Sequence, residues 1–187
     1  MFKSFLLTLL FVISARAQGP NVKISVSLSP AGDFVAETEN VIGNAVLGDN
    51  GVVEASNIRV DVKSLKSGIS LRDNHMINKY LEAAKYPEVI LKIGKGSANK
   101  GEAILVIKGK EGKVSGTYAT NSQFLKAEFK IKLSDFGITD INYKGIGVED
   151  EIKVVAVVPL VKKVEGAPAV LGKKAPLKIA SPPAPKK

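Results

Sequence analysis

The amino-acid sequence predicts a mainly β fold, in which about eight short antiparallel strands close into a barrel or pack as a sandwich. Val and Ile dominate the apolar residues, and β-branched side chains fit the pleated surface of a strand well. Apolar and polar residues also alternate with a period of two along several segments, as they do in strands with one wet face. Of the two arrangements, a closed barrel leaves no exposed strand edge.

The clearest alternation covers residues 125–133, where apolar residues alternate with Lys and Glu. One face of this strand is therefore apolar and the other is charged. The same pattern predicts strands over 22–28, 57–62 and 152–158. Weaker strand candidates, separated by turn-forming Gly, Pro, Asn and Asp, are 34–38, 41–47, 89–94, 102–108 and 113–119.

One segment between the strands has helical spacing instead. Its apolar residues recur as on one face of a helix, at Met76, Ile77, Tyr80, Leu81 and Ala84. Ser70 and Asp73 have the spacing of a capping box, and Pro87 cannot continue a helix. We therefore expect one short helix near 72–84, inserted between strands.

The ends of the sequence differ in composition from its middle, which predicts three parts. Residues 1–17 combine Lys3, a short apolar stretch and the small residues Ala15 and Ala17, which is typical of a signal peptide cleaved after Ala17. This segment predicts a periplasmic or secreted protein. Residues 18–161 form the β domain, and residues 162–187 form a tail rich in Lys, Pro and Ala.

The tail is expected to be extended and disordered, because proline removes backbone donors and like charges repel. A solvated tail without a function is the simpler interpretation. The alternative is weak contact with an anionic envelope polymer or membrane surface through its Lys residues.

Charge and residue types exclude several function classes. The net charge of +9 is concentrated at the ends, since residues 18–161 hold 18 basic and 17 acidic residues, so we expect no nucleic-acid partner. The sequence has no Cys, which excludes thiol catalysis and Cys-ligated metals. His75 is the only His and lacks a second His or a Cys to work with, so we expect no catalytic residue, no metal site and no enzymatic activity.

Several short motifs together resemble the YceI-like family. The first block, in residues 62–87, has Ser and Gly at a turn, an Arg-Asp pair, a short helix and a Tyr-Pro pair. These features are Ser64, Ser67, Gly68, Arg72, Asp73, His75, Tyr86 and Pro87. Segments 107–109, 133–138 and 145–152 resemble later blocks of the family in the same order.

The resemblance implies an extended antiparallel, eight-stranded, lipocalin-like β-barrel with a long apolar tunnel. It implies non-enzymatic binding, storage or transport of an isoprenoid lipid of the polyprenyl or prenyl-quinone type. No cofactor other than this lipid is expected. Because members of the family can dimerise through the side of the barrel, the resemblance also makes a homodimer an expectation.

If the barrel has a tunnel, its lining should come from the inward faces of the strands. The expected lining residues are Ile24, Val26, Ile58, Val60, Leu91, Ile93, Phe129, Ile131, Val154 and Ala156. Residues expected near a head group or an entrance are Lys63, Arg72, Lys79, Tyr80 and Phe136. Because a filled core gives the same alternation, the alternative function is an envelope protein-interaction module with a filled barrel, which recruits partners through its helix surface or basic tail.

Overall fold

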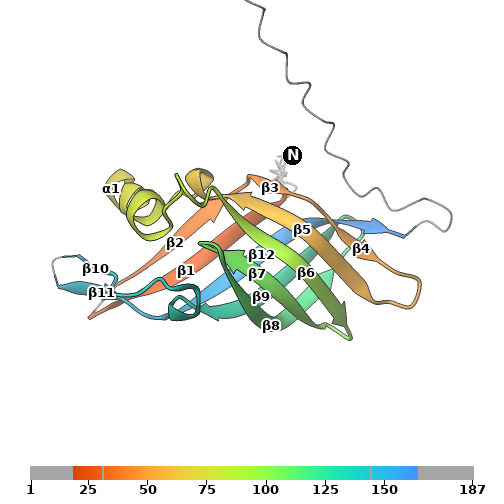
Figure 1. Cartoon of the computed structure of the whole chain (residues 1–187). Helices are drawn as coiled ribbons and strands as arrows, with labels where there is room; N and C mark the ends of the chain where they lie inside the picture. The colour runs from red at the N-terminus through yellow and green to blue at the C-terminus, as the bar shows by residue number, and fades with distance from the viewer. Residues whose placement is uncertain (1–18, 31, 144, 164–187) are drawn as a thin grey trace, which may run out of the picture.

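The computed structural model describes residues 19–30, 32–143 and 145–163. The predicted signal peptide over 1–17 and nearly all of the predicted tail over 162–187 lie outside this part of the chain. The described residues form a β-barrel with a short helical segment at one end (Figure 1). This confirms the expected mainly β architecture with one short helical insertion.

Seven of the twelve strands in the described residues have eight or more residues, and the strands follow one another closely along the chain. They are β1 (Asn21–Ser29), β2 (Asp33–Thr38), β3 (Val41–Ile42), β4 (Ala45–Leu47), β5 (Val53–Asp61), β6 (Glu88–Ser97), β7 (Lys100–Ile107), β8 (Lys110–Thr120), β9 (Phe124–Lys132), β10 (Asn142–Tyr143), β11 (Ile146–Val148) and β12 (Glu151–Lys162). The helical elements are η1 (Val62–Ser64), α1 (Ser70–Asn74), η2 (His75–Tyr80) and η3 (Ser134–Phe136).

The barrel closes through strand β12, which pairs with β9 along one edge. On its other edge, β12 pairs antiparallel with β1 and then, through Leu160–Lys162, parallel with β4. The hydrogen-bonded ring therefore runs β4-β5-β6-β7-β8-β9-β12 and has seven strands, while β2 pairs with β1 beside it. The expected count of eight differs because β12 is long enough to share one edge between two partners.

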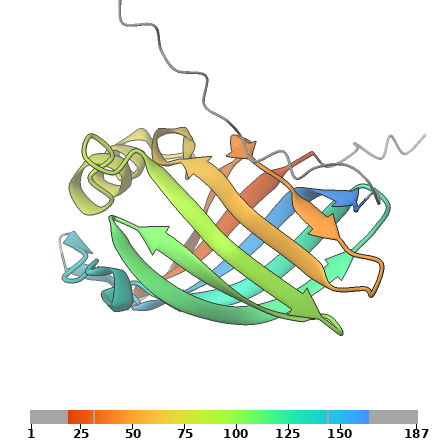
Figure 2. The ribbon, with the colours of Figure 1, turned by 45° about the vertical axis from the view of Figure 1, so that its right-hand side comes forward.

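The two ends of the barrel carry different elements. Helix α1 and the β10–β11 hairpin lie at one end, and the turn between β6 and β7 lies at the opposite end (Figures 1 and 2). No helix within the described part of the chain is long and apolar enough to cross a membrane.

Strands β5 and β6 both change face partway along their length. Leu91 and Ile93 of β6 pair with the consecutive residues Leu105 and Ile104 of β7, so Lys92 is an extra residue that forms a bulge. In the neighbouring β5, Asn57 lies opposite this point and has a positive φ of 54°. An extra residue reverses the inward and outward faces beyond it. We call this feature the paired bulge.

The helical segment begins and ends earlier than the predicted 72–84. Helix α1 starts at Ser70, and the π-helical turn η2 follows it directly and ends at Tyr80. Glu82 has a positive φ of 50°, so the backbone has already left the helix before Pro87. Ser70 does not cap the helix, because Ile69 holds the cap position without a side-chain bond.

Asp73 takes a different role from the expected capping box. Its Oδ1 accepts hydrogen bonds from the Ser67 backbone N–H at 2.8 Å and from the Ser67 hydroxyl at 2.6 Å. Burial alone would raise the pKa of the Asp73 carboxyl, but these bonds and the charges of Lys66 and Arg72 hold the pKa below its ordinary value of 3.8. Asp73 therefore fixes the turn at Ser67 and Gly68 against the first turn of α1.

The outer face of the barrel carries ion pairs within strand β9 and between β9 and β12. Glu128 of β9 contacts Lys126 at 2.9 Å and Lys153 of β12 at 3.0 Å, and Lys130 contacts Glu151 at 2.6 Å. These side chains are largely exposed, so each pair contributes little to stability. They account for the charged half of the alternation in β9.

Candidate functional site

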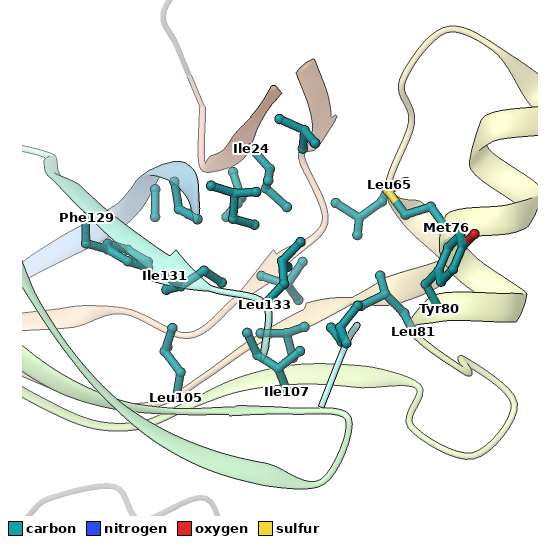
Figure 3. A pocket seen from close by; sticks show the side chains of 18 of the residues that line it. Ile24, Leu65, Met76, Tyr80, Leu81, Leu105, Ile107, Phe129, Ile131 and Leu133 are labelled. Carbon is teal, nitrogen blue, oxygen red and sulfur yellow. The ribbon is translucent and has the colours of Figure 1, made fainter. Parts of the chain in front are cut away.

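The barrel encloses a cavity of about 470 Å³. Its wall comes from inward-facing side chains of the barrel strands and, at one end, from the segment that holds α1 and η2. Figure 3 shows this lining, with Phe129 and Ile131 on one side and Met76 and Tyr80 on the other. Side chains therefore do not fill the interior of the barrel. The protein-interaction alternative would require a filled interior.

The lining is almost wholly apolar. Among the described residues that border the cavity, the side chains with polar groups are Arg72, His75 and Tyr80, and all three belong to α1 or η2. A surface of this kind excludes water and favours hydrocarbon, because apolar area leaves water when a hydrocarbon enters.

Nine of the ten residues expected in a tunnel lining border this cavity. They are Ile24, Val26, Ile58, Val60, Leu91, Phe129, Ile131, Val154 and Ala156. Several of them, such as Phe129 and Ala156, point inward and are still only half-buried, because they face open space inside the barrel. Alternation along the strands identified the inward face correctly wherever the strand was regular.

Ile93 is the exception, and its expected place in the lining is wrong. Its side chain is 56% exposed and does not border the cavity. The bulge at Lys92 adds one residue between Leu91 and Ile93, so the inward face passes from Leu91 to Gly94.

Two of the five residues expected near an entrance border the cavity, namely Arg72 and Tyr80. The Arg72 guanidinium lies 4.2 Å from the centre of the Phe34 ring in β2, a cation–π contact that ties α1 to the barrel wall. The Lys79 ammonium lies 5.0 Å from the centre of the Tyr80 ring but is itself exposed and outside the lining. Lys63 is also exposed, and its backbone N–H donates to Asp61.

Phe136 was expected near an opening, and this expectation is wrong. Its side chain is 1% exposed and packs in the main core against Gly112. A Cβ at Gly112 would lie 2.5 Å from Cζ of the Phe136 ring, so the ring occupies the space that the glycine leaves. Phe136 therefore closes the wall beside β8.

Sequence reasoning missed the exposed apolar rim of the cavity. Ile69, Leu71 and Ile146 border the cavity and are also 51%, 52% and 44% exposed. We call these three residues the rim. Ile69 and Leu71 begin the α1 segment, and Ile146 begins β11. The rim therefore lies at the same end of the barrel as α1 (Figure 2). The residues come from a short helix and a short hairpin, where no long alternation or helical period marks them.

Comparison with protein families and solved structures identifies relatives of this fold. The YceI-like domain model matches residues 17–160. The crystal structure of BcnA from Burkholderia cenocepacia has a TM-score of 0.56 and 18% identity, and the match covers 74% of this chain and 95% of that one. A polyisoprenoid binding domain from Saccharophagus degradans, implicated in plant cell wall breakdown, has a TM-score of 0.53 and 14% identity, with 74% and 91% covered.

A third similar structure is a mutant CJ YCEI protein with a monobromobimane guest structure. Its TM-score is 0.53 and its identity is 17%, and the match covers 69% of this chain and 85% of that one. At such identities the likeness shows a shared fold. The comparison with curated proteins gives no significant match.

Proposed function

We propose, because this chain belongs to the YceI-like family, that its barrel binds the hydrocarbon chain of an isoprenoid lipid without catalysing a reaction. The observation that carries the proposal is the apolar cavity of about 470 Å³ inside the barrel. A solved relative that shares the fold is described as a polyisoprenoid binding domain. The protein would store such a lipid or carry it between membranes.

The size of the cavity sets the size of chain that it could hold. A benzene molecule occupies an apolar protein cavity of about 150 Å³. By the same scale, a cavity of about 470 Å³ has room for about 20 carbon atoms, or roughly four isoprene units. Burial of each isoprene unit contributes about 4 kcal/mol before the cost of association, so chains that fill the cavity should bind much better than short ones.

The polar group of the lipid should lie beside α1 and η2. Arg72 and Tyr80 supply a guanidinium and a phenol at this side of an otherwise apolar lining. A phosphate or quinone head group can accept hydrogen bonds from both side chains. The hydrocarbon would then extend from this end toward the middle of the barrel.

We also propose that the protein is exported after cleavage behind Ala17, on the strength of the pattern in residues 1–17. In an envelope compartment the lipid source and its destination would both be membranes.

The test is native mass spectrometry of the protein purified from its own host, followed by titration of the delipidated protein with geranylgeraniol, a prenyl alcohol of four isoprene units. A co-purified mass of a prenyl lipid, and saturable binding of geranylgeraniol, are expected. Absence of any prenyl lipid from the purified protein, together with no binding in the titration, would overturn the proposal.

A further inference from the structure

A second, smaller cavity lies farther along the barrel. It has a volume of about 100 Å³ and is bordered by β5, β6, β7, β8 and β9. Six apolar residues border both cavities, so the two spaces adjoin each other. These shared residues are Ala55, Leu91, Leu105, Leu125, Ala127 and Phe129. We call them the waist.

Beyond the waist the inward positions carry unusually small residues. Gly94 and Gly96 of β6, Gly101 of β7 and Gly116 of β8 all border the second cavity. They lie near the turn between β6 and β7, at the end of the barrel opposite α1 (Figure 2). Small residues on adjacent strands leave space that larger side chains would fill.

The Tyr118 ring lies against two of these glycines. A Cβ at Gly96 would lie 2.5 Å from Cε1 of Tyr118, so the ring rests directly on this glycine. A Cβ at the neighbouring Gly101 would lie 3.7 Å from Cδ1 of the same ring. Tyr118 borders the second cavity but not the first, and it packs against the core cluster at this end of the barrel.

The position of the ring also suits its two chemical parts. Tyr118 is only half-buried, and no buried side-chain oxygen or nitrogen of the described residues lacks a hydrogen-bond partner. The apolar ring can therefore face the cavity while its hydroxyl group remains satisfied. The Tyr118 ring therefore forms part of the wall of the second cavity.

We propose that the second cavity is a subsite for the tail of the bound isoprenoid chain, and that Tyr118 sets the longest chain that fits. This inference rests on the proposed function. A chain that fills the first cavity would reach the second by passing the waist residues, which border both. On the benzene scale, about 100 Å³ accommodates about four carbon atoms, close to one isoprene unit. The chain then ends against the Tyr118 ring.

The test uses all-trans prenyl alcohols that differ by one isoprene unit, bound competitively against a fluorescent fatty-acid analogue. In the wild type, affinity should rise with each unit up to a limit of about five units and then stop rising. Tyr118→Ala removes the ring and should move this limit upward by about one unit, with a gain in affinity of at least about tenfold for the first chain beyond the wild-type limit. Tyr118→Phe keeps the ring and should leave the limit unchanged.

A second variant tests the same subsite in the opposite direction. Ala103 of β7 borders the second cavity and not the first. Ala103→Leu should fill this space and move the limit downward by about one unit, with little effect on shorter chains. If Tyr118→Ala does not fold, the result for Ala103→Leu decides the question.

The outcomes separate the inference from its premise. A wild-type protein that binds no prenyl alcohol of any length contradicts the proposed function itself. A wild type that binds them, with an unchanged limit in folded Tyr118→Ala or in Ala103→Leu, overturns only the tail subsite.

Discussion

Substitution of Ala156 by Phe tests whether the open interior is the binding site. Ala156 lies on β12, opposite Ala127 of β9, and both residues border the cavity. Its methyl group faces space that no side chain fills, so a phenyl ring at this position would project into the cavity. Apo-protein stability and lipid binding should therefore change in opposite directions.

The magnitudes follow from the cavity volume. A phenyl ring needs about 150 Å³, which is about one third of the 470 Å³ available. The variant should lose room for about six carbon atoms of ligand, which corresponds to about 2–5 kcal/mol of binding free energy and an affinity loss of at least thirtyfold. Filling a cavity should meanwhile raise the free energy of unfolding of the lipid-free protein by about 0.5–2 kcal/mol.

The assay combines thermal unfolding of the delipidated protein with titration by geranylgeraniol. Val155→Phe is the matched control, because Val155 is the adjacent residue on the outward face, paired with Glu128 and Lys23. This control should bind lipid as the wild type does. Unchanged affinity in Ala156→Phe would show that the lipid binds elsewhere, and a lower unfolding temperature would show that the interior has no room for the ring.

Two further predictions concern the parts of the fold that shape the site. Because the folded pKa of Asp73 lies below 3.8, the unfolded chain binds the proton first as the pH falls, so the stability from this carboxylate is full above about pH 5 and is lost as the pH drops through the folded pKa. Asp73→Asn should thus lower the free energy of unfolding, measured by urea denaturation, by about 1–3 kcal/mol at pH 7, and this loss should shrink steadily as the pH falls below about 4. A loss that stays the same across this pH range would contradict the ionic role. Gly116→Ala should destabilise the barrel by about 1–3 kcal/mol, because its Cβ would overlap the carbonyl oxygen of Glu128 and lie 2.8 Å from Cβ of Phe129. Gly94→Ala, whose Cβ would meet Ala103 at 3.3 Å, is the control for urea unfolding and should change stability by less than about 1 kcal/mol, and equal effects of the two would refute the steric argument.

The sequence predicted the parts of the fold that depend on local pattern. In the regular strands β9 and β12, alternation identified inward residues such as Phe129 and Val154. It failed at Ile93, since a bulge depends on the pairing of several strands and leaves no clear mark in one of them. Phe136 was misplaced for a related reason, because its burial depends on Gly112 of strand β8, which is distant in the sequence.

The open interior could not be predicted from alternation at all. An inward Ala or Val has the same pattern whether it meets another side chain or empty space. The resemblance carried in residues 62–87 favoured a tunnel, and the geometry adds its volume, its rim and its far end. The rim residues Ile69 and Leu71 lie in a segment too short for any periodic signal.

The paired bulge at Asn57 and Lys92 changes which residue numbers point into the barrel along β5 and β6. Inward positions along β5 and β6 are odd-numbered before the bulge, as at Val53 and Leu91, and even-numbered after it, as at Ile58 and Gly94. Deleting a single bulge residue would turn one half of a strand inside out while the other half kept its orientation. The design of insertions, deletions and reporter labels in β5 and β6 must therefore assign inward and outward positions separately on each side of the paired bulge.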